Sequence, residues 1–170
     1  MQKNNFSSFL SRLQQQKNAI TKLIKQDVPR IIKVEGLNHF EESWDNQGFT
    51  DSTLKKWDAR REPAKKFRKD GKALKSYKKW AAKNKGRAIL VSHRTDTRGG
   101  HLKDSIKAEI KGNSVIFSTD KPYAKVHNEG GKAGRGKGFI MPKRQFLGAS
   151  KTLNDKIMDR INTEISKIFS

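Results

Sequence analysis

The chain reads YAKVHNEGG over residues 123–131 and, after a run rich in Gly, Lys and Arg, MPKRQFLG over residues 141–148. The first stretch is typical of a short helical turn that ends at paired glycines, because Tyr123 and His127 are four residues apart and share a helix face. In the second stretch, Pro142 cannot donate a backbone hydrogen bond and therefore predicts an edge strand or a connector. Together the two stretches predict a short helix, a flexible loop and a connector that leads into a C-terminal helix.

The C-terminal helix is predicted by apolar residues that recur every three or four positions from Leu153 to Ile168. Ser150 is its expected N-cap, because a serine side chain can accept a hydrogen bond from the first turn. We expect Phe146 and Leu147, just before it, to anchor this helix against the rest of the fold as ordinary core residues.

Two helices are predicted near the N-terminus. Apolar residues at helical spacing favour a first helix over residues 6–24. A second helix is expected to begin with Asp27 as its N-cap and Pro29 in its first turn, and to end near Trp44. A turn should follow at residues 46–48.

Short apolar runs after residue 87 predict strands. They lie at residues 88–91, within residues 102–110, where apolar and polar residues alternate in the second half, and at residues 114–118. The sequence Lys-Gly-Asn at residues 111–113 predicts a hairpin turn between the last two, because Gly and Asn tolerate positive φ angles.

These elements predict an α+β fold. We expect N-terminal helices, a small antiparallel sheet, a short crossover helix and a C-terminal helix packed on the sheet, in a single domain over residues 1–170. A basic, mobile and partly helical insertion is expected at about residues 50–87, and a flexible loop rich in Gly, Lys and Arg at residues 130–138.

The charge of the chain is strongly positive, at +21 over 170 residues. Residues 54–87 hold 15 Lys and Arg against three acidic residues, a net charge of +12. Such a charge indicates partners such as nucleic acid, an acidic protein surface or an anionic membrane. The chain has no cysteine, which excludes disulfides and thiolate metal sites. No signal peptide or membrane-spanning run is visible, so we expect no membrane partner.

His127 is the residue of the opening stretch best suited to carry chemistry, as a general base or a metal ligand. Either role needs a second group within reach, such as a carboxylate that orients the ring. Glu129 is close in sequence, but a helical turn points it elsewhere. We therefore interpret His127 as a structural residue where the helix meets the glycines, and we expect no catalytic residue, no cofactor and no enzyme activity.

Two further patterns have some likeness to ligand sites. One is a repeated H-x-x-D arrangement formed by His93, Asp96, His101 and Asp104. Its basic neighbours make a divalent cation unfavourable there, and we expect no metal. The other is G-x-x-x-x-G-K at residues 131–137, but a glycine follows it where a phosphate-binding loop needs Ser or Thr. We interpret it as a chance match.

With DTRGGHLKDSI at residues 96–106, the opening stretches closely resemble the phage virion morphogenesis family, over roughly residues 28–170. The family pattern reads TGxLxxSI, then YAxxHxxGG, then PxRxFLG. Residues that carry the pattern here are Asp104, Ser105, Ile106, Tyr123, Ala124, His127, Asn128, Gly130, Gly131, Pro142, Arg144, Phe146, Leu147 and Gly148. The chain departs from it in its long basic insertion and in Arg98-Gly99-Gly100, which replaces a tighter turn.

The resemblance implies a structural protein that completes the tail or joins head and tail at the neck. It would act in the host cytoplasm during assembly and remain in the virion. Related proteins at this position form rings, commonly hexameric, through which the genome passes. We therefore expect a ring oligomer, contacts with other phage neck or tail proteins, and genomic DNA in the lumen.

The basic residues also predict contacts with DNA. The candidates are Lys65, Lys66, Arg68 and Lys69 in the insertion, and Lys132, Arg135 and Lys137 in the glycine-rich loop. Bases could stack on Trp57, Tyr77 or Trp80. Charge and aromatic residues alone would also fit a sequence-independent nucleic-acid-binding protein, and this alternative stays open. So does a solvated insertion that becomes ordered in an assembly.

Overall fold

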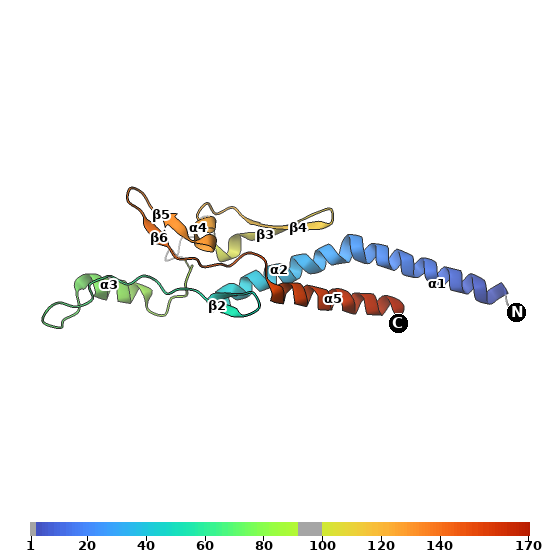
Figure 1. Cartoon of the computed structure of the whole chain (residues 1–170), viewed down its shortest axis with the longest axis horizontal. Coiled ribbons are helices and arrows are strands. Elements are labelled where there is room, and N and C mark those ends of the chain that lie inside the picture. Colours follow the sequence, from blue (N-terminus) through green and yellow to red (C-terminus); the bar gives the residue numbers. More distant parts are fainter. Residues whose placement is uncertain (1–2, 92–99) are drawn as a thin grey trace.

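The computed structural model describes residues 3–91 and 100–170. A continuous helix runs through α1 (Lys3–Lys22), the π-helical segment η1 (Leu23–Asp27) and α2 (Val28–Asp45), and its N-terminal part projects beyond the rest of the molecule (Figure 1). The predicted N-cap role of Asp27 is wrong, because Asp27 has helical dihedral angles and its side chain caps nothing, whereas α2 does have Pro29 in its first turn and ends at Asp45, close to Trp44 as predicted. Pro29 has no N–H for the helical ladder, and the wider π-turn before it, closed by the Val28 N–H on the Leu23 carbonyl, accommodates the proline within the helix.

Short strands and helices make up the remainder. Within the described residues the strands form three separate antiparallel pairs, β1–β2, β3–β4 and β5–β6. The predicted α+β class is confirmed. The elements are β1 (Gly48–Thr50), β2 (Leu54–Lys56), α3 (Lys75–Asn84), the 3-10 turn η2 (Lys103–Ser105), β3 (Ile106–Lys111), β4 (Ser114–Thr119), α4 (Ala124–Glu129), β5 (Gly131–Ala133), β6 (Phe139–Met141) and α5 (Lys151–Phe169).

Two predictions from local sequence differ from the structure. Residues 88–91 form no strand: Ile89 and Leu90 lie in a turn and pack their side chains on the core. That apolar run serves packing between distant segments rather than a strand ladder. The glycine-rich residues 130–138 contribute β5, which pairs with β6 from Gly131 opposite Met141 to Ala133 opposite Phe139.

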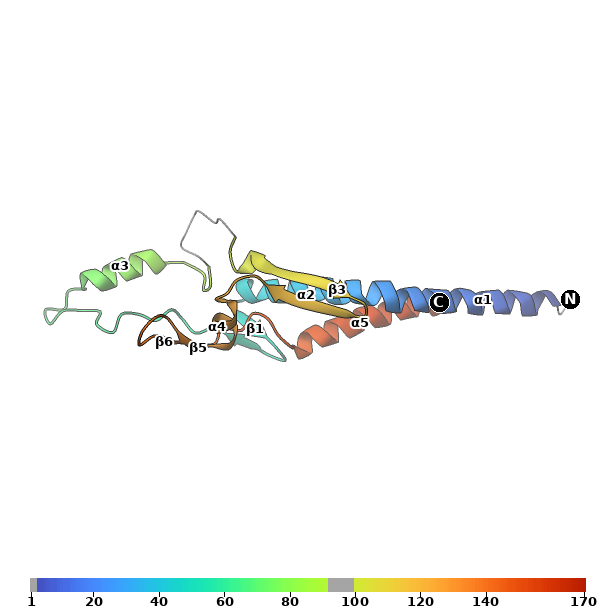
Figure 2. The same ribbon diagram turned by 90° about the horizontal axis from the view of Figure 1, so that it is seen from above.

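The core lies along the C-terminal half of α2, which contributes Phe40 and Trp44. Two buried clusters occupy the described part of the chain: Trp44, Trp57, Leu102, Ala124 and Phe146 form one, and Phe40, Phe49 and Leu153 form the other. Half-buried Ile106 and Leu147 contact both. Figures 1 and 2 show β3–β4 along one side of α2 and α5 along another. The strands and α5 meet in the second cluster, where Phe117 joins Leu153.

The start of α5 is fixed to the β1–β2 turn. The Ser150 hydroxyl accepts the Leu153 N–H at 3.1 Å, which confirms the predicted N-cap, and donates to the Thr50 carbonyl at 2.9 Å. The Asp51 carboxylate accepts the Lys151 N–H at 2.7 Å. From there α5 runs antiparallel to α2, with Lys156 3.3 Å from Glu42 and Arg160 paired with Glu35.

Gly36 of α2 lies against the Phe117 side chain of β4. A Cβ at this position would lie 2.2 Å from Cζ and 2.6 Å from Cε1 of Phe117. The Phe117 ring in turn packs edge-on against Phe40, with ring centroids 5.1 Å apart. A glycine inside a helix usually weakens it, and here the missing side chain makes room for the aromatic ring.

We predict that Gly36→Ala lowers the free energy of unfolding by about 1–3 kcal/mol, the usual cost of overpacking a core. The gain in helix propensity from Gly to Ala, about 1 kcal/mol, is too small to reverse the sign. Urea unfolding followed by circular dichroism measures the difference. Asn38→Ala, on the exposed side of the same helix, is the control and should be neutral or slightly stabilising. Equal stabilisation by both substitutions would contradict the packing of Phe117 on Gly36.

Candidate functional site

The residues of the sequence pattern converge on the connector, residues 142–149, that joins β6 to α5. The Asn128 side-chain oxygen at the end of α4 accepts the N–H groups of Phe146 and Leu147, at 2.9 and 3.0 Å. The His127 carbonyl accepts the Arg144 N–H at 2.8 Å. The short helix α4 therefore holds the connector by accepting three of its backbone N–H groups, two at the Asn128 side chain and one at the His127 carbonyl.

Phe146 fills the centre of the first core cluster. Its side chain is 1% exposed, and its ring lies 5.0 Å from that of Trp44. Ala124 of α4, also part of the pattern, is buried in the same cluster. The expectation that Phe146 and Leu147 are core residues is met by this packing.

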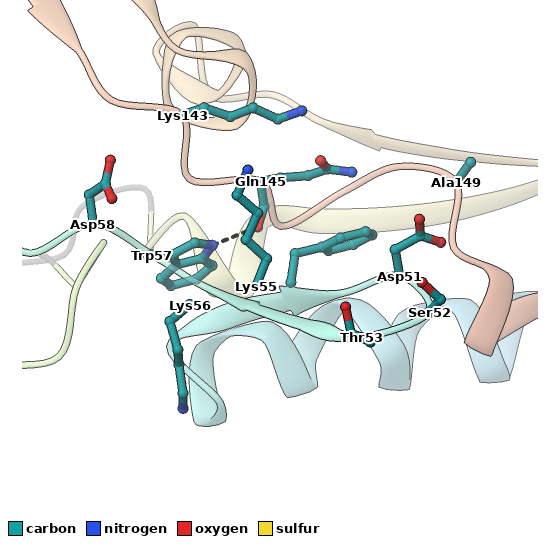
Figure 3. Close-up of a pocket in the computed structure, with 11 residues that line it drawn as sticks. Asp51, Ser52, Thr53, Lys55, Lys56, Trp57, Asp58, Lys143, Gln145 and Ala149 are labelled. Carbon is teal, nitrogen blue, oxygen red and sulfur yellow. Dashed lines mark hydrogen bonds between the residues drawn. The ribbon is translucent and has the colours of Figure 1, made fainter.

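Arg144 binds the chain that follows β2. Its guanidinium is buried, and it donates from Nε to the Asp58 carbonyl at 2.9 Å and from Nη2 to the Ala59 carbonyl at 3.0 Å. Beside it, the Trp57 indole donates to the Gln145 carbonyl at 2.6 Å (Figure 3). Because Trp57 is buried in the core, it is not available to stack on a base.

Arg60, which no sequence pattern singled out, closes the base of the basic insertion. Its Nη1 donates to the Arg87 carbonyl at 2.8 Å, and its Nη2 donates to the Ala88 carbonyl. The Ile89 N–H donates to the side-chain oxygen of Gln47 at 2.5 Å. Residues 61–86, called the basic arm below, therefore leave and rejoin the body at a fixed point. The sequence does not distinguish Arg60 from the other cations around it, because the carbonyls that it binds are more than 25 residues away.

The upstream part of the pattern is structural as well. The Ser105 hydroxyl, which is buried, donates to the Leu102 carbonyl at 2.8 Å and lies 2.6 Å from the Thr119 hydroxyl. This contact ties η2 to the end of β4. Ile106 begins β3 and packs on the core, whereas Asp104 is exposed. Residues 96–99 of the pattern lie outside the described residues.

Gly130 and Gly131 allow the chain to pass from α4 into β5. Gly130 has φ +77°, and a Cβ there would lie 2.9 Å from the Lys143 nitrogen. The close approach and the positive φ angle both require glycine. Pro142 follows β6 as the start of the connector, as predicted, and Gly148 near its end has φ +149°.

His127 has the surroundings of a structural residue. Its ring lies half-buried, 5.9 Å from the Tyr123 ring in an edge-on contact. Burial, and secondarily the positive charge of Arg144, lower the pKa of His127 below its usual value. Its Nδ1 is buried and finds no hydrogen-bond partner among the described residues. Nothing in this geometry orients the ring as a general base.

No group of three or more His, Cys, Asp or Glu side chains that could hold a metal ion occurs among the described residues. Of the H-x-x-D pattern, His101 and Asp104 belong to the described residues, whereas His93 and Asp96 lie outside them. Within the same ranges, no helix is long and apolar enough to cross a membrane.

A cleft of about 470 Å³ lies between the β1–β2 hairpin and the connector (Figure 3). Asp51 and Asp58 line it together with three lysines, Lys55, Lys56 and Lys143. The hydroxyls of Ser52 and Thr53 also face it, but its lining holds no histidine that could activate them. The cleft therefore contains side chains of both charges, but its lining does not combine a nucleophile with a histidine that could act as its general base.

The predicted DNA-contacting residues fall into two places. Lys66 pairs with Glu62 and lies 5.9 Å from the centre of the Tyr77 ring, and Arg68 lies 4.0 Å from Asp70. Their charges are thus partly balanced by local carboxylates. Lys65 and Lys69 of the same run are exposed, and Lys132, Arg135 and Lys137 belong to the β5–β6 hairpin.

The fold and this site define an α+β protein whose recognisable sequence pattern joins segments of the chain by packing and backbone hydrogen bonds. The sequence model of the phage virion morphogenesis family matches residues 52–166, and the chain belongs to that family. Membership of this family indicates a role in the assembly of phage virions.

A curated relative supports the same assignment. The chain is 47% identical over 47 residues to "Mu-like prophage FluMu G protein 2" of Haemophilus influenzae. That match spans 28% of this chain and 34% of the relative, so the chain aligns with about a third of the relative's length. No solved structure matches this chain.

We predict that Asn128→Ala destabilises the protein, because two half-buried backbone N–H groups lose their acceptor. An unsatisfied buried group costs about 1–3 kcal/mol. Asn128→Asp is the matched control, because a carboxylate can accept both bonds and should retain most of the stability. Chemical unfolding of the three proteins measures this. If alanine and aspartate behaved alike, the two hydrogen bonds would not hold the connector.

We also predict that His127 contributes to the loss of stability at acidic pH. Its pKa is lowered in the folded protein, so below about pH 6.5 the unfolded chain binds a proton that the folded protein resists. This stabilising contribution of His127 is fully present above the pKa of the unfolded chain. It is lost as the pH falls from that pKa through the lower pKa of the folded protein. Unfolding at about pH 7.5 and 5.5 should show a smaller difference for His127→Gln than for the unsubstituted protein. An unchanged difference would contradict this assignment.

Proposed function

We propose that this protein is a non-enzymatic structural component that completes the phage tail or joins head and tail at the neck. In this proposal it works as a ring of identical subunits around the path of the DNA, in contact with other neck or tail proteins. Membership of the virion morphogenesis family supports the assembly role. The use of the sequence pattern for packing rather than for chemistry supports a structural protein.

The observation that carries the proposal is an uncovered apolar stripe on α1. Four large apolar residues that share this face are 46–65% exposed: Phe6, Phe9, Leu10 and Leu13. With Ile20 and Ile24, positions 6, 10, 13, 20 and 24 are spaced by four, three, seven and four residues, which keeps them on one face of the helix, as in helices that pack against each other. An exposed apolar surface of this kind on a projecting helix indicates a protein partner.

A second copy of the chain offers a suitable surface on α5. Met158, Ile165 and Phe169 are exposed on a face of α5 that neither α2 nor the strands cover. The same helix carries Asp159 and Asp155 among its basic residues, with Asp155 paired to Lys151, whereas α1 carries basic residues and no acidic one. Two α1 helices would therefore repel each other, and α1 of one subunit on α5 of the next is favoured. A head-to-tail contact of this kind closes into a ring when the rotation allows it.

The alternative function, sequence-independent nucleic-acid binding by a monomer, is favoured by the charge of the basic arm. The oligomeric state separates the two. A ring that forms without nucleic acid supports assembly, whereas a monomer with tight affinity for DNA supports the alternative.

We predict that the purified protein is a closed oligomer, and that Leu10→Asp with Leu13→Asp shifts it to monomers. Two buried carboxylates in the interface would be strongly unfavourable. Light scattering over a wide concentration range and negative-stain imaging measure the assembly. The control is Ser11→Asp with Gln15→Asp, which adds the same charge on the opposite face of α1 and should leave the oligomer intact.

The same variants test the role in the virion. In the phage that encodes this chain, deletion of its gene should leave separate heads and tails. The unsubstituted protein and the Ser11/Gln15 variant should restore joined particles, and the Leu10/Leu13 variant should not. A strictly monomeric protein, or joined virions without the gene, would refute the proposal.

A further inference from the structure

The basic arm, residues 61–86, projects from the end of the molecule opposite the tip of α1 (Figures 1 and 2). It carries 11 Lys and Arg against Glu62 and Asp70, a net charge of +9 in 26 residues. A run of cations is usually a solvated surface. The basic arm differs from such a solvated run of cations because it has an internal structure of its own.

The arm is folded on its own aromatic side chains. The Tyr77 and Trp80 rings stack 6.2 Å apart with 13° between their planes, and Phe67 packs on Tyr77 at 5.7 Å. A backbone bridge between Phe67 and Ala73 brings the chain back to the start of α3. The Tyr77 and Trp80 rings are half-buried and engaged with each other, which leaves less of their faces for unstacked bases, whereas Phe67 is 58% exposed.

The opposite face of α3 is a row of lysines. Lys75, Lys78, Lys79 and Lys83 are all exposed, and their spacing of three, four and eight residues places them on one side of the helix. Tyr77 and Trp80 lie on the other side. The row spans about 12 Å at 1.5 Å per residue. The sequence of α3, KSYKKWAAKN, contains no carboxylate that could neutralise it.

We infer that the lysine face of α3 binds the phosphate backbone of duplex nucleic acid without regard to sequence. Lysines that meet phosphates release counterions and read no base edges. The engaged aromatic rings disfavour single strands, whose binding depends on bases stacking on free rings. The four lysines of α3 also differ from Lys66 and Arg68, which have carboxylates of the arm beside them.

The position of the arm supports a binding role rather than a loose tail. Arg60 joins the two ends of the arm, and Arg144 fixes the adjoining residues 58 and 59 to the connector. The lysine face is therefore carried on a base that belongs to the packed site. The inference assigns a ligand, duplex nucleic acid, to the arm. It rests on the proposed function only for the place in the virion where the arm would meet the duplex.

The test compares three full-length proteins on random-sequence duplex DNA labelled with a fluorophore, by anisotropy at several salt concentrations. One is unsubstituted, one carries Lys75→Gln, Lys78→Gln, Lys79→Gln and Lys83→Gln, and the control carries four glutamines at exposed lysines of the body: Lys22, Lys25, Lys125 and Lys143. Both variants lose the same charge. The α3 variant should bind about tenfold more weakly or worse, and its slope of log affinity against log salt should fall by up to about 3.6, at about 0.9 per phosphate contact.

The control variant should lose much less affinity, and a second duplex of different sequence should bind equally well. Equal loss in both variants would show an effect of net charge alone and overturn the inference. Unchanged duplex binding by the α3 variant would overturn it too, and reduced binding of that variant to polyglutamate would then identify an acidic protein as the partner. Light scattering on the same samples separates the two proposals, because an intact oligomer with unchanged DNA affinity refutes only this inference.

Discussion

The two hydrogen bonds from Phe146 and Leu147 to the Asn128 side chain are the contact on which the rest of the structure depends. They fix the connector so that Phe146 enters the cluster of Trp44 and Trp57. With the connector in place, Arg144 reaches the carbonyls of residues 58 and 59, and Ser150 starts α5 against the β1–β2 turn. Only 33% of the chain is hydrophobic, so few side chains are available for a core. Buried polar contacts between distant segments therefore do much of the positioning.

Local signals in the sequence predict most of the secondary structure. The hairpin at residues 111–113, the short helix before the paired glycines and the Ser150 cap each depend on residues within a few positions of one another. The predictions that failed have two different reasons, one local and one that depends on distant contacts. Asp27 has the chemistry of an N-cap, but a π-turn carries the helix through Pro29. The apolar run at residues 88–91 packs on a cluster whose side chains come from positions as far apart in the sequence as Trp44 and Phe146.

The candidate site shows the same division. The family pattern contains Asn128, Arg144 and Phe146, but nothing in the pattern tells which backbone groups they bind. Those partners lie 18 residues away for Asn128 and more than 80 for Arg144. Trp57 and Trp80 are alike in sequence, as aromatic residues within a basic stretch, and only the fold separates them. One is in the core, and the other stacks on Tyr77 in the arm. The structure also separates the lysines of α3 from Lys66 and Arg68, because only the latter two have carboxylates beside them.

The continuous helix of residues 3–45 links the two surfaces that face away from the core. It is about 65 Å long at 1.5 Å per residue. Its C-terminal end supplies Trp44 to the core, and Gln47 just beyond it binds the base of the basic arm. Its N-terminal end carries the uncovered stripe of Phe6 to Leu13. Because α2 is packed between β3–β4 and α5 and Gln47 follows it directly, the same continuous helix fixes both the direction of α1 and the base of the arm. In the proposed assembly, a subunit bound through α1 would therefore present its basic arm in one orientation, and the contact between subunits would also determine where the positive charge lies.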